Sequence, residues 1–129
     1  MTTMQDYIRH KFEKAADALK AGEILFESGL PIEAVSKVYY SVFNAALALL
    51  AQSNLAPKTH TGVKSLFNKE FVLSGKIDKK TGTILGELLT KRMEADYEDF
   101  TLIDEEELPE LIEKAKRFIE AAKKQLELS

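Results

Sequence analysis

Residues 31–52 read PIEAVSKVYYSVFNAALALLAQ, and this stretch decides the fold. Its apolar residues recur at intervals of three and four in two neighbouring stripes: Val35, Val38, Val42, Ala45 and Leu49, and Tyr39, Phe43, Ala46 and Leu50. Such intervals put residues on one side of an α-helix, and two adjacent stripes leave only a narrow polar side. Proline favours a helix start. We therefore predict a central helix over residues 31–52, buried on most of its circumference.

The rest of the chain shows the same helical period and no alternation typical of strands. Four further helices are expected from stripes and capping residues. One precedes Gly29-Leu30-Pro31, and the others run over Thr59–Leu73, Asp78 to about Tyr97, and Asp104 to about Leu126. Five helices with short joins predict an all-α antiparallel bundle, largely up-and-down.

Length and composition limit the class of protein. A chain of 129 residues with 45% hydrophobic content corresponds to one domain, residues 1–129, around one core. The absence of cysteine excludes disulfides and thiolate metal sites and agrees with a reducing compartment. We find no signal-peptide pattern and no apolar run long enough to cross a bilayer. A cytoplasmic protein without a membrane partner is expected.

The net charge of -3 is unevenly distributed. Residues 58–91 carry seven lysines and three acids, whereas residues 92–107 carry one arginine and eight acids. A phosphate group or an acidic partner would suit the lysines of the basic segment, which include Lys58, Lys64, Lys69, Lys76, Lys79 and Lys80. Because arginines and aromatic residues do not accompany them, a solvated helix surface is the favoured interpretation.

Residues 92–97 continue a buried stripe. Steps of four, three and four lead from Leu85 through Leu89 to Arg92 and Asp96, so the charged pair lies on the side that the leucines mark as buried. A semi-buried Arg–Asp pair needs hydrogen-bond partners to offset its desolvation. The candidate partners are Tyr39, Tyr40, His60 and Tyr97. A structural ion pair and a functional site both stay open.

Several local patterns occur together: Tyr39-Tyr40-Ser41-Val42-Phe43, Lys58-Thr59-His60, Phe71-Val72 with Gly75, and Arg92 with Ala95-Asp96-Tyr97. Their order and spacing resemble the HEPN domain (higher eukaryotes and prokaryotes nucleotide-binding), over about residues 5–125. More narrowly, the chain resembles the small stand-alone HEPN proteins encoded beside minimal nucleotidyltransferases. This resemblance implies a helical bundle that forms a homodimer with facing clefts. We place Tyr39, Tyr40, Lys58 and Arg92 at the cleft.

Ribonucleases of the HEPN family carry an arginine followed, after four to six residues, by a histidine. The corresponding positions here hold Tyr97, Glu98 and Asp99. Metal-independent RNA cleavage needs a proton acceptor, a proton donor and a cation. Arg92 would supply the cation, with His60 or Tyr97 in support, so the candidate catalytic residues are Arg92, His60, Asp96 and Tyr97. The competing interpretation makes His60 structural, hydrogen-bonded to Asp96 or to a tyrosine.

Two functions follow from the resemblance. The preferred one is a non-catalytic or weakly catalytic module that binds nucleotide or RNA and works with a minimal nucleotidyltransferase in a toxin–antitoxin-like pair. The alternative is a metal-independent RNA endonuclease toxin that uses Arg92 with His60 or Tyr97. Modification of Tyr97 by the transferase is a third, less favoured role. No metal or other cofactor is expected, because no His-x-x-x-His pair and no glycine-rich phosphate loop occur.

Overall fold

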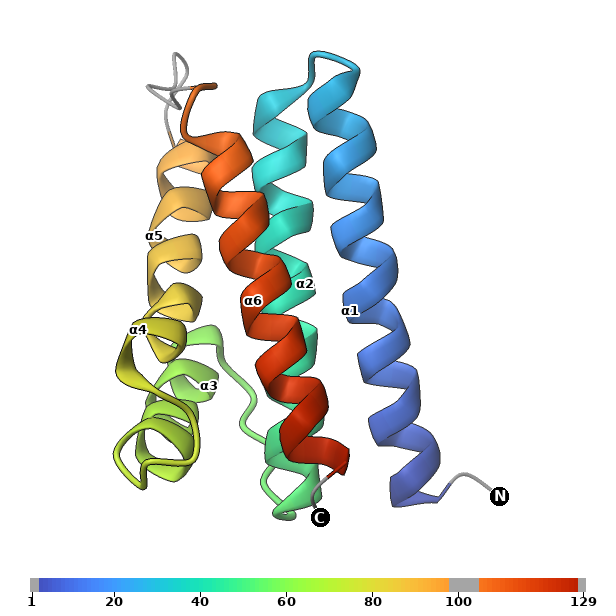
Figure 1. Cartoon of the computed structure of the whole chain (residues 1–129), viewed down its shortest axis with the longest axis vertical. Coiled ribbons are helices and arrows are strands. Elements are labelled where there is room, and N and C mark those ends of the chain that lie inside the picture. Colours follow the sequence, from blue (N-terminus) through green and yellow to red (C-terminus); the bar gives the residue numbers. More distant parts are fainter. Residues whose placement is uncertain (1–2, 98–104, 128–129) are drawn as a thin grey trace.

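The computed structural model describes residues 3–97 and 105–127, apart from the side chains of Asp96 and Tyr97. In this part of the chain every regular element is helical (Figure 1). In chain order the elements are α1 (Met4–Glu27), α2 (Pro31–Gln52), α3 (His60–Phe67), the π-helical segment η1 (Asn68–Val72), α4 (Lys79–Gly82), α5 (Ile84–Tyr97) and α6 (Leu108–Glu127). The predicted all-α bundle is confirmed.

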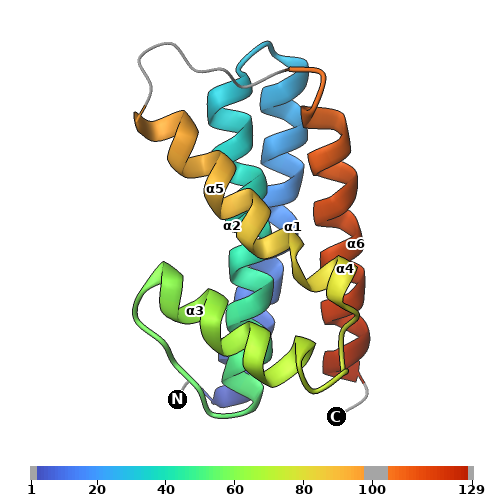
Figure 2. The same ribbon diagram turned by 90° about the vertical axis from the view of Figure 1, so that its left-hand side faces the viewer.

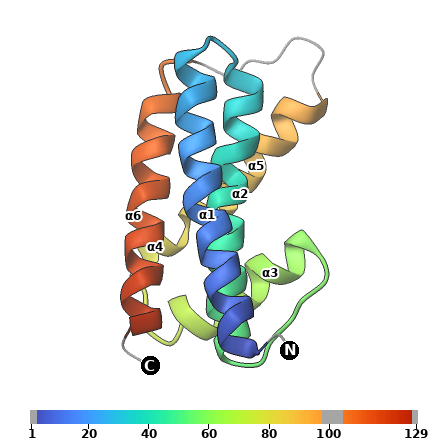
Figure 3. The same ribbon diagram turned by 90° about the vertical axis from the view of Figure 1, so that its right-hand side faces the viewer.

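Helix α2 is central, and it spans the residues predicted for it. It contacts α1, α3, α5 and α6, and Figure 3 shows α1 lying beside both α2 and α6. Eight of the nine stripe residues are buried and Phe43 is partly buried. By length and composition α2 would also suffice to cross a membrane, so the prediction that no run reaches that length was wrong. Its burial is that of a core helix in a bundle.

The predicted third and fourth helices are each interrupted. Residues 59–73 form α3 followed by η1, and residues 78–97 form the short α4 and the longer α5, with Thr83 between them. Gly82 lies so close to η1 that a Cβ atom there would collide with the Val72 side chain. The Thr83 hydroxyl donates to a carbonyl of the preceding turn, a bond that competes with regular helix. The close approach of Gly82 to η1 depends on tertiary packing, so helical periodicity does not reveal it.

The predicted caps of the described helices are present. Thr59 Oγ1 accepts a hydrogen bond from the backbone N–H of Gly62 at 2.9 Å, and Asp78 Oδ2 accepts one from that of Thr81 at 3.0 Å. Each cap satisfies a backbone donor of a first helical turn. The predicted buried side of α5 is confirmed by Leu85, Leu88 and Leu89. The predicted start of the last helix at Asp104 lies outside the described residues.

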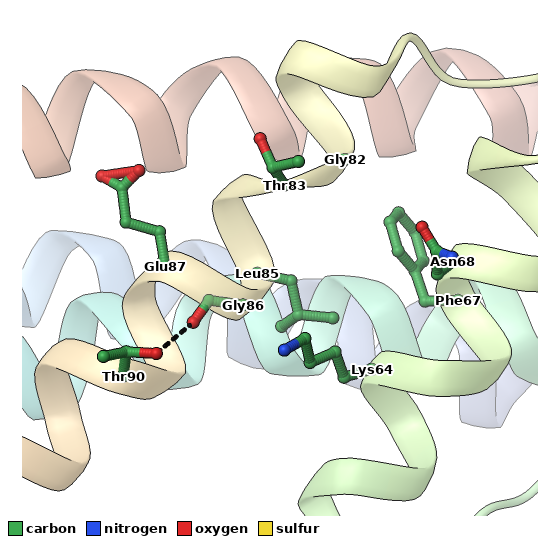
Figure 4. Close-up of a pocket in the computed structure, with 9 residues that line it drawn as sticks. All are labelled: Lys64, Phe67, Asn68, Gly82, Thr83, Leu85, Gly86, Glu87 and Thr90. Carbon is green, nitrogen blue, oxygen red and sulfur yellow. Dashed lines mark hydrogen bonds between the residues drawn. The ribbon is translucent and has the colours of Figure 1, made fainter.

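Two helical glycines provide a matched test of packing. At Gly22 a Cβ atom would lie 2.8 Å from Cγ2 of Val38, which is fully buried, whereas at Gly86 it would lie 2.8 Å from Cε of Lys64, an exposed and flexible side chain. Figure 4 shows Lys64 beside Gly86. Replacing glycine by alanine favours helix at both positions, but only Gly22→Ala strains the core. We expect Gly86→Ala to be more stable than Gly22→Ala by about 1–3 kcal/mol.

Urea unfolding of the two variants measures this difference directly. The helix-propensity gain is common to both and cancels in the comparison. Equal stabilities would mean that α1 and α2 separate easily at Gly22, in conflict with the close helix contact described above.

Candidate functional site

Five side chains from three helices meet on one side of α2: Tyr39, Tyr40 and Phe43 of α2, His60 of α3 and Arg92 of α5. We call this set the aromatic–arginine cluster. Figure 2 shows α3 and α5 lying across the same side of α2. This arrangement brings together residues that are far apart in the chain, and each is held by a regular helix.

His60 is the first residue of α3 and is fixed by two contacts with α2. Its Nδ1 atom lies 2.6 Å from the hydroxyl oxygen of Tyr39, and its ring stacks on Phe43 with centroids 4.6 Å apart. Tyr39 is fully buried, so its hydroxyl group needs a partner. The structural interpretation of His60 predicted a hydrogen bond to Asp96 or to a tyrosine, and the structure shows the bond to a tyrosine, Tyr39.

Arg92 packs against two aromatic rings. Its Cζ atom lies 4.8 Å from the ring centroid of Tyr40 and 5.4 Å from that of Tyr39, within the range of cation–π attraction. The planar guanidinium group carries five N–H donors in a fixed fork, a geometry that matches phosphate and carboxylate groups. Arg92 is therefore a partly buried cation whose position is held by two aromatic rings.

The surroundings of the cluster keep the Tyr39 phenol and the His60 imidazole neutral at pH 7. Burial raises the pKa of Tyr39 well above its ordinary value, against the opposing effect of Arg92. Burial, and then the positive charge of Arg92, lower the pKa of His60 below 6.5. An imidazole nitrogen is a stronger base than a phenol oxygen, so we assign Tyr39 O–H as the donor and His60 Nδ1 as the acceptor.

The lowered pKa of His60 predicts how stability depends on pH. The unfolded chain, with a histidine pKa of about 6.5, binds this proton more readily than the folded chain. The contribution of His60 to the free energy of unfolding is therefore complete above about pH 6.5, and it is lost as pH falls through the lower folded-state value. Urea unfolding at about pH 7.5 and about pH 5.5 measures this effect. Between the two pH values, the free energy of unfolding should fall less in His60→Asn than in wild type.

An NMR titration of the imidazole supplies the control. The His60 pKa should lie below the ordinary value in wild type and should rise in Arg92→Ala, because the nearby cation is removed. An unchanged His60 pKa in that variant would show that Arg92 does not act on the imidazole.

The other predicted site residues are Lys58, Asp96 and Tyr97. Lys58 is exposed and precedes the cap of α3, and no described contact joins it to the cluster. Asp96 and Tyr97 belong to α5, but their side chains are outside the described residues, as are the predicted contacts of Asp96 with Arg92 and His60. Phe43 was predicted as a core residue only. Its position four residues after Tyr39 places it one helical turn away on the same side.

A ligand at the cluster would meet one oriented cation, a partly buried phenol ring and a neutral imidazole. A guanidinium group binds phosphate through paired charge-assisted hydrogen bonds, and an aromatic ring stacks on a base. Within residues 3–97 and 105–127, no three His, Cys, Asp or Glu side chains lie close enough together to hold a metal ion. The cluster therefore combines a cation with aromatic rings.

Comparisons with known proteins agree with this architecture. The model of the HEPN domain family matches residues 8–126. A protein of Methanocaldococcus jannaschii named "Putative toxin MJ0605" is 37% identical over 95% of this chain and 91% of its own length. A second protein of that organism, "Putative toxin MJ0142", is 37% identical over 88% of this chain and 78% of its own.

A third relative, the "UPF0332 protein" of Thermotoga maritima, is 30% identical over 98% of this chain and 96% of its own length. The relatives and the family model therefore cover nearly the whole helical bundle and every residue of the aromatic–arginine cluster. The chain belongs to the HEPN domain family.

Proposed function

We propose that this protein binds a nucleotide or RNA through the aromatic–arginine cluster, with little or no cleavage activity. One observation carries the proposal: the Arg92 guanidinium group lies over the rings of Tyr39 and Tyr40, close enough to His60 for its charge to lower the His60 pKa. A guanidinium group is suited to bind a phosphate, and an aromatic ring such as that of Tyr40, which is partly buried, is suited to stack on a base. The cluster therefore contains one group suited to the phosphate of a nucleotide and one suited to its base.

Weak catalysis follows from the protonation of the cluster. Cleavage of RNA needs one group to accept the 2′-hydroxyl proton and another to protonate the leaving oxygen. His60 has a lowered pKa and its Nδ1 accepts from Tyr39, so it donates a proton poorly at pH 7. Tyr39 has a raised pKa and no exposure to solvent. The histidine that would supply the second group after Arg92 is absent from the sequence.

We further propose that the protein is a cytoplasmic homodimer that acts with a minimal nucleotidyltransferase in a toxin–antitoxin-like pair. The names of two relatives include the word toxin, which supports a role in such a pair. The family resemblance supports the dimer and the transferase partner. Light scattering at micromolar concentration should give the mass of two chains, and a monomer would count against this part of the proposal.

The alternative function is an RNA endonuclease toxin that uses Arg92 with His60 or Tyr97. It is favoured by the neutral imidazole of His60 in the same cluster as Arg92, because Nδ1 could accept a proton from RNA in place of the hydrogen bond from Tyr39. In that case Arg92 would stabilise the charge that develops on the phosphate in the transition state.

A parallel RNA cleavage assay separates the two functions. Total RNA is incubated with wild type, Arg92→Ala and His60→Ala, and wild type is also purified together with a nucleotidyltransferase encoded beside it. The preferred function predicts intact RNA in all three samples and copurification of the two proteins. Degradation of RNA by wild type and not by Arg92→Ala would overturn it in favour of the endonuclease.

A further inference from the structure

A second charged site lies between α4, with the loop before it, and the C-terminal half of α6. It is a groove of about 580 Å³. Its charged lining residues are Lys76, Asp78, Lys80, Arg117, Glu120 and Lys124, and we call it the basic groove. In Figure 2, α4 and α6 lie on the right, whereas the N-terminal end of α3 and the C-terminal end of α5 lie on the left. The basic groove is therefore distinct from the aromatic–arginine cluster.

The shape of the basic groove is fixed by contacts within the fold. Gln125 Nε2 donates to the backbone carbonyl of Lys76 at 2.8 Å, which ties the loop to α6. Ile77 is buried and anchors the same loop in the core. Asp78 is engaged as the cap of α4 through its bond from Thr81. The charged side chains thus extend from a backbone that is held in place before any ligand arrives.

The cations of the groove differ from other lysines on the same helix. Lys114 and Lys116 of α6 each lie within 4.0 Å of a carboxylate. Among the described residues, no carboxylate oxygen lies within that distance of Lys80, Arg117 or Lys124. With four cations and two acids around it, the groove carries a positive charge on a chain whose net charge is -3.

The chemistry of the lining favours nucleic acid over a protein partner. Protein–protein interfaces have cores rich in aromatic and large apolar residues and poor in lysine. The groove has no aromatic lining residue, and its apolar members are the buried Ile77 and the small Ala121. Lysine and arginine side chains are instead the usual contacts to phosphate oxygens. We propose that the basic groove binds the phosphate backbone of RNA, as a second RNA-binding surface.

This surface goes beyond the proposed function of the cluster and makes its own prediction. RNA bound at the groove releases counterions for each phosphate that is contacted, so its affinity falls as salt rises. The double variant Arg117→Ala/Lys124→Ala removes two cations from exposed positions of α6. Arg9→Ala/Lys20→Ala is its matched control, because it removes one arginine and one lysine from exposed positions of α1.

The probe is fluorescein-labelled oligouridylate of about 20 nucleotides, which is longer than the roughly 4–16 nucleotides covered by a typical single-strand-binding fold. Its binding is measured by fluorescence anisotropy at several salt concentrations. The groove variant should bind about tenfold more weakly than wild type, and its salt slope should fall by about 1.4, or 0.7 for each lost contact. The control should keep the wild-type affinity and slope. Oligoglutamate of equal charge serves as the competing probe.

Each other outcome contradicts the proposal. Equal affinity and equal slope in the two double variants would show that RNA does not bind at the groove. Oligoglutamate that binds wild type as tightly as RNA, and loses affinity in the groove variant, would assign the groove to an acidic protein. Arg92→Ala is measured in parallel, because loss of RNA binding only in that variant leaves the cluster proposal intact and removes this one. If wild type binds no RNA, both proposals fail.

Discussion

Replacement of Arg92 by alanine is expected to weaken the binding of single-stranded RNA by about 10- to 150-fold. The range corresponds to the loss of one charged hydrogen-bonding partner, about 1.5–3 kcal/mol. The guanidinium group is oriented by its contacts with the rings of Tyr39 and Tyr40, so little conformational entropy is lost when it binds a phosphate. Fluorescence anisotropy with a short oligonucleotide, too short to reach the basic groove, measures the effect.

Two variants serve as controls for this result. Arg9→Ala removes the same charge from an exposed position of α1, where the side chain is 70% accessible, and it should bind RNA like wild type. Arg92→Lys keeps the charge but loses the planar fork and its stacking, so an intermediate affinity is expected. If Arg9→Ala and Arg92→Ala are equally weakened, the effect is one of net charge and the cluster is not the site.

Replacement of Phe67 by alanine is expected to lower the free energy of unfolding by about 3–5 kcal/mol. Phe67 is 1% exposed. The centroid of its ring lies 5.1 Å from that of the Phe118 ring and 5.5 Å from that of the Phe71 ring. It therefore anchors the short helix α3 to α6. Isolated helices of this length are unstable in water, so α3 depends on such packing. Urea unfolding monitored by circular dichroism checks the value.

Leu73→Ala is the control for the Phe67 variant, since Leu73 follows η1 and is 75% exposed. Its effect should stay within about 0.5 kcal/mol. Phe67→Leu keeps much of the volume and should cost about 1.5 kcal/mol or less. Because α3 carries His60, Phe67→Ala should also shift the His60 resonances toward those of an exposed histidine. A loss of stability below about 1 kcal/mol would mean that the space collapses around the missing ring.

The fold was predictable where local signals agree. The bounds of α2 follow from Pro31 and from two apolar stripes, and the caps at Thr59 and Asp78 are local hydrogen bonds. The division of residues 78–97 into α4 and α5 depends instead on how closely Gly82 approaches η1. A helical period continues across such a break, because the apolar residues on both sides face the same core.

The candidate site was predictable in its residues but not in its arrangement. Helical spacing indicated that Arg92 lies on a buried side, and it named Tyr39, Tyr40 and His60 as candidate partners. The bond of Tyr39 to His60 depends on how α3 crosses α2, which no local pattern specifies. Equally, the lysines before and within α4 were visible in the sequence, but Arg117 joins them only when α6 packs beside them.

An NMR titration of the cluster with single-stranded RNA tests the central claim most directly. The ring resonances of His60 and Tyr40 should shift and reach saturation, because Arg92 lies over the Tyr40 ring and its charge acts on His60. The RNA recovered at the end should be intact, since the neutral imidazole is accompanied by no efficient proton donor among the described residues. Resonances that stay in place while RNA binds, or RNA that is cleaved during the titration, would contradict the account.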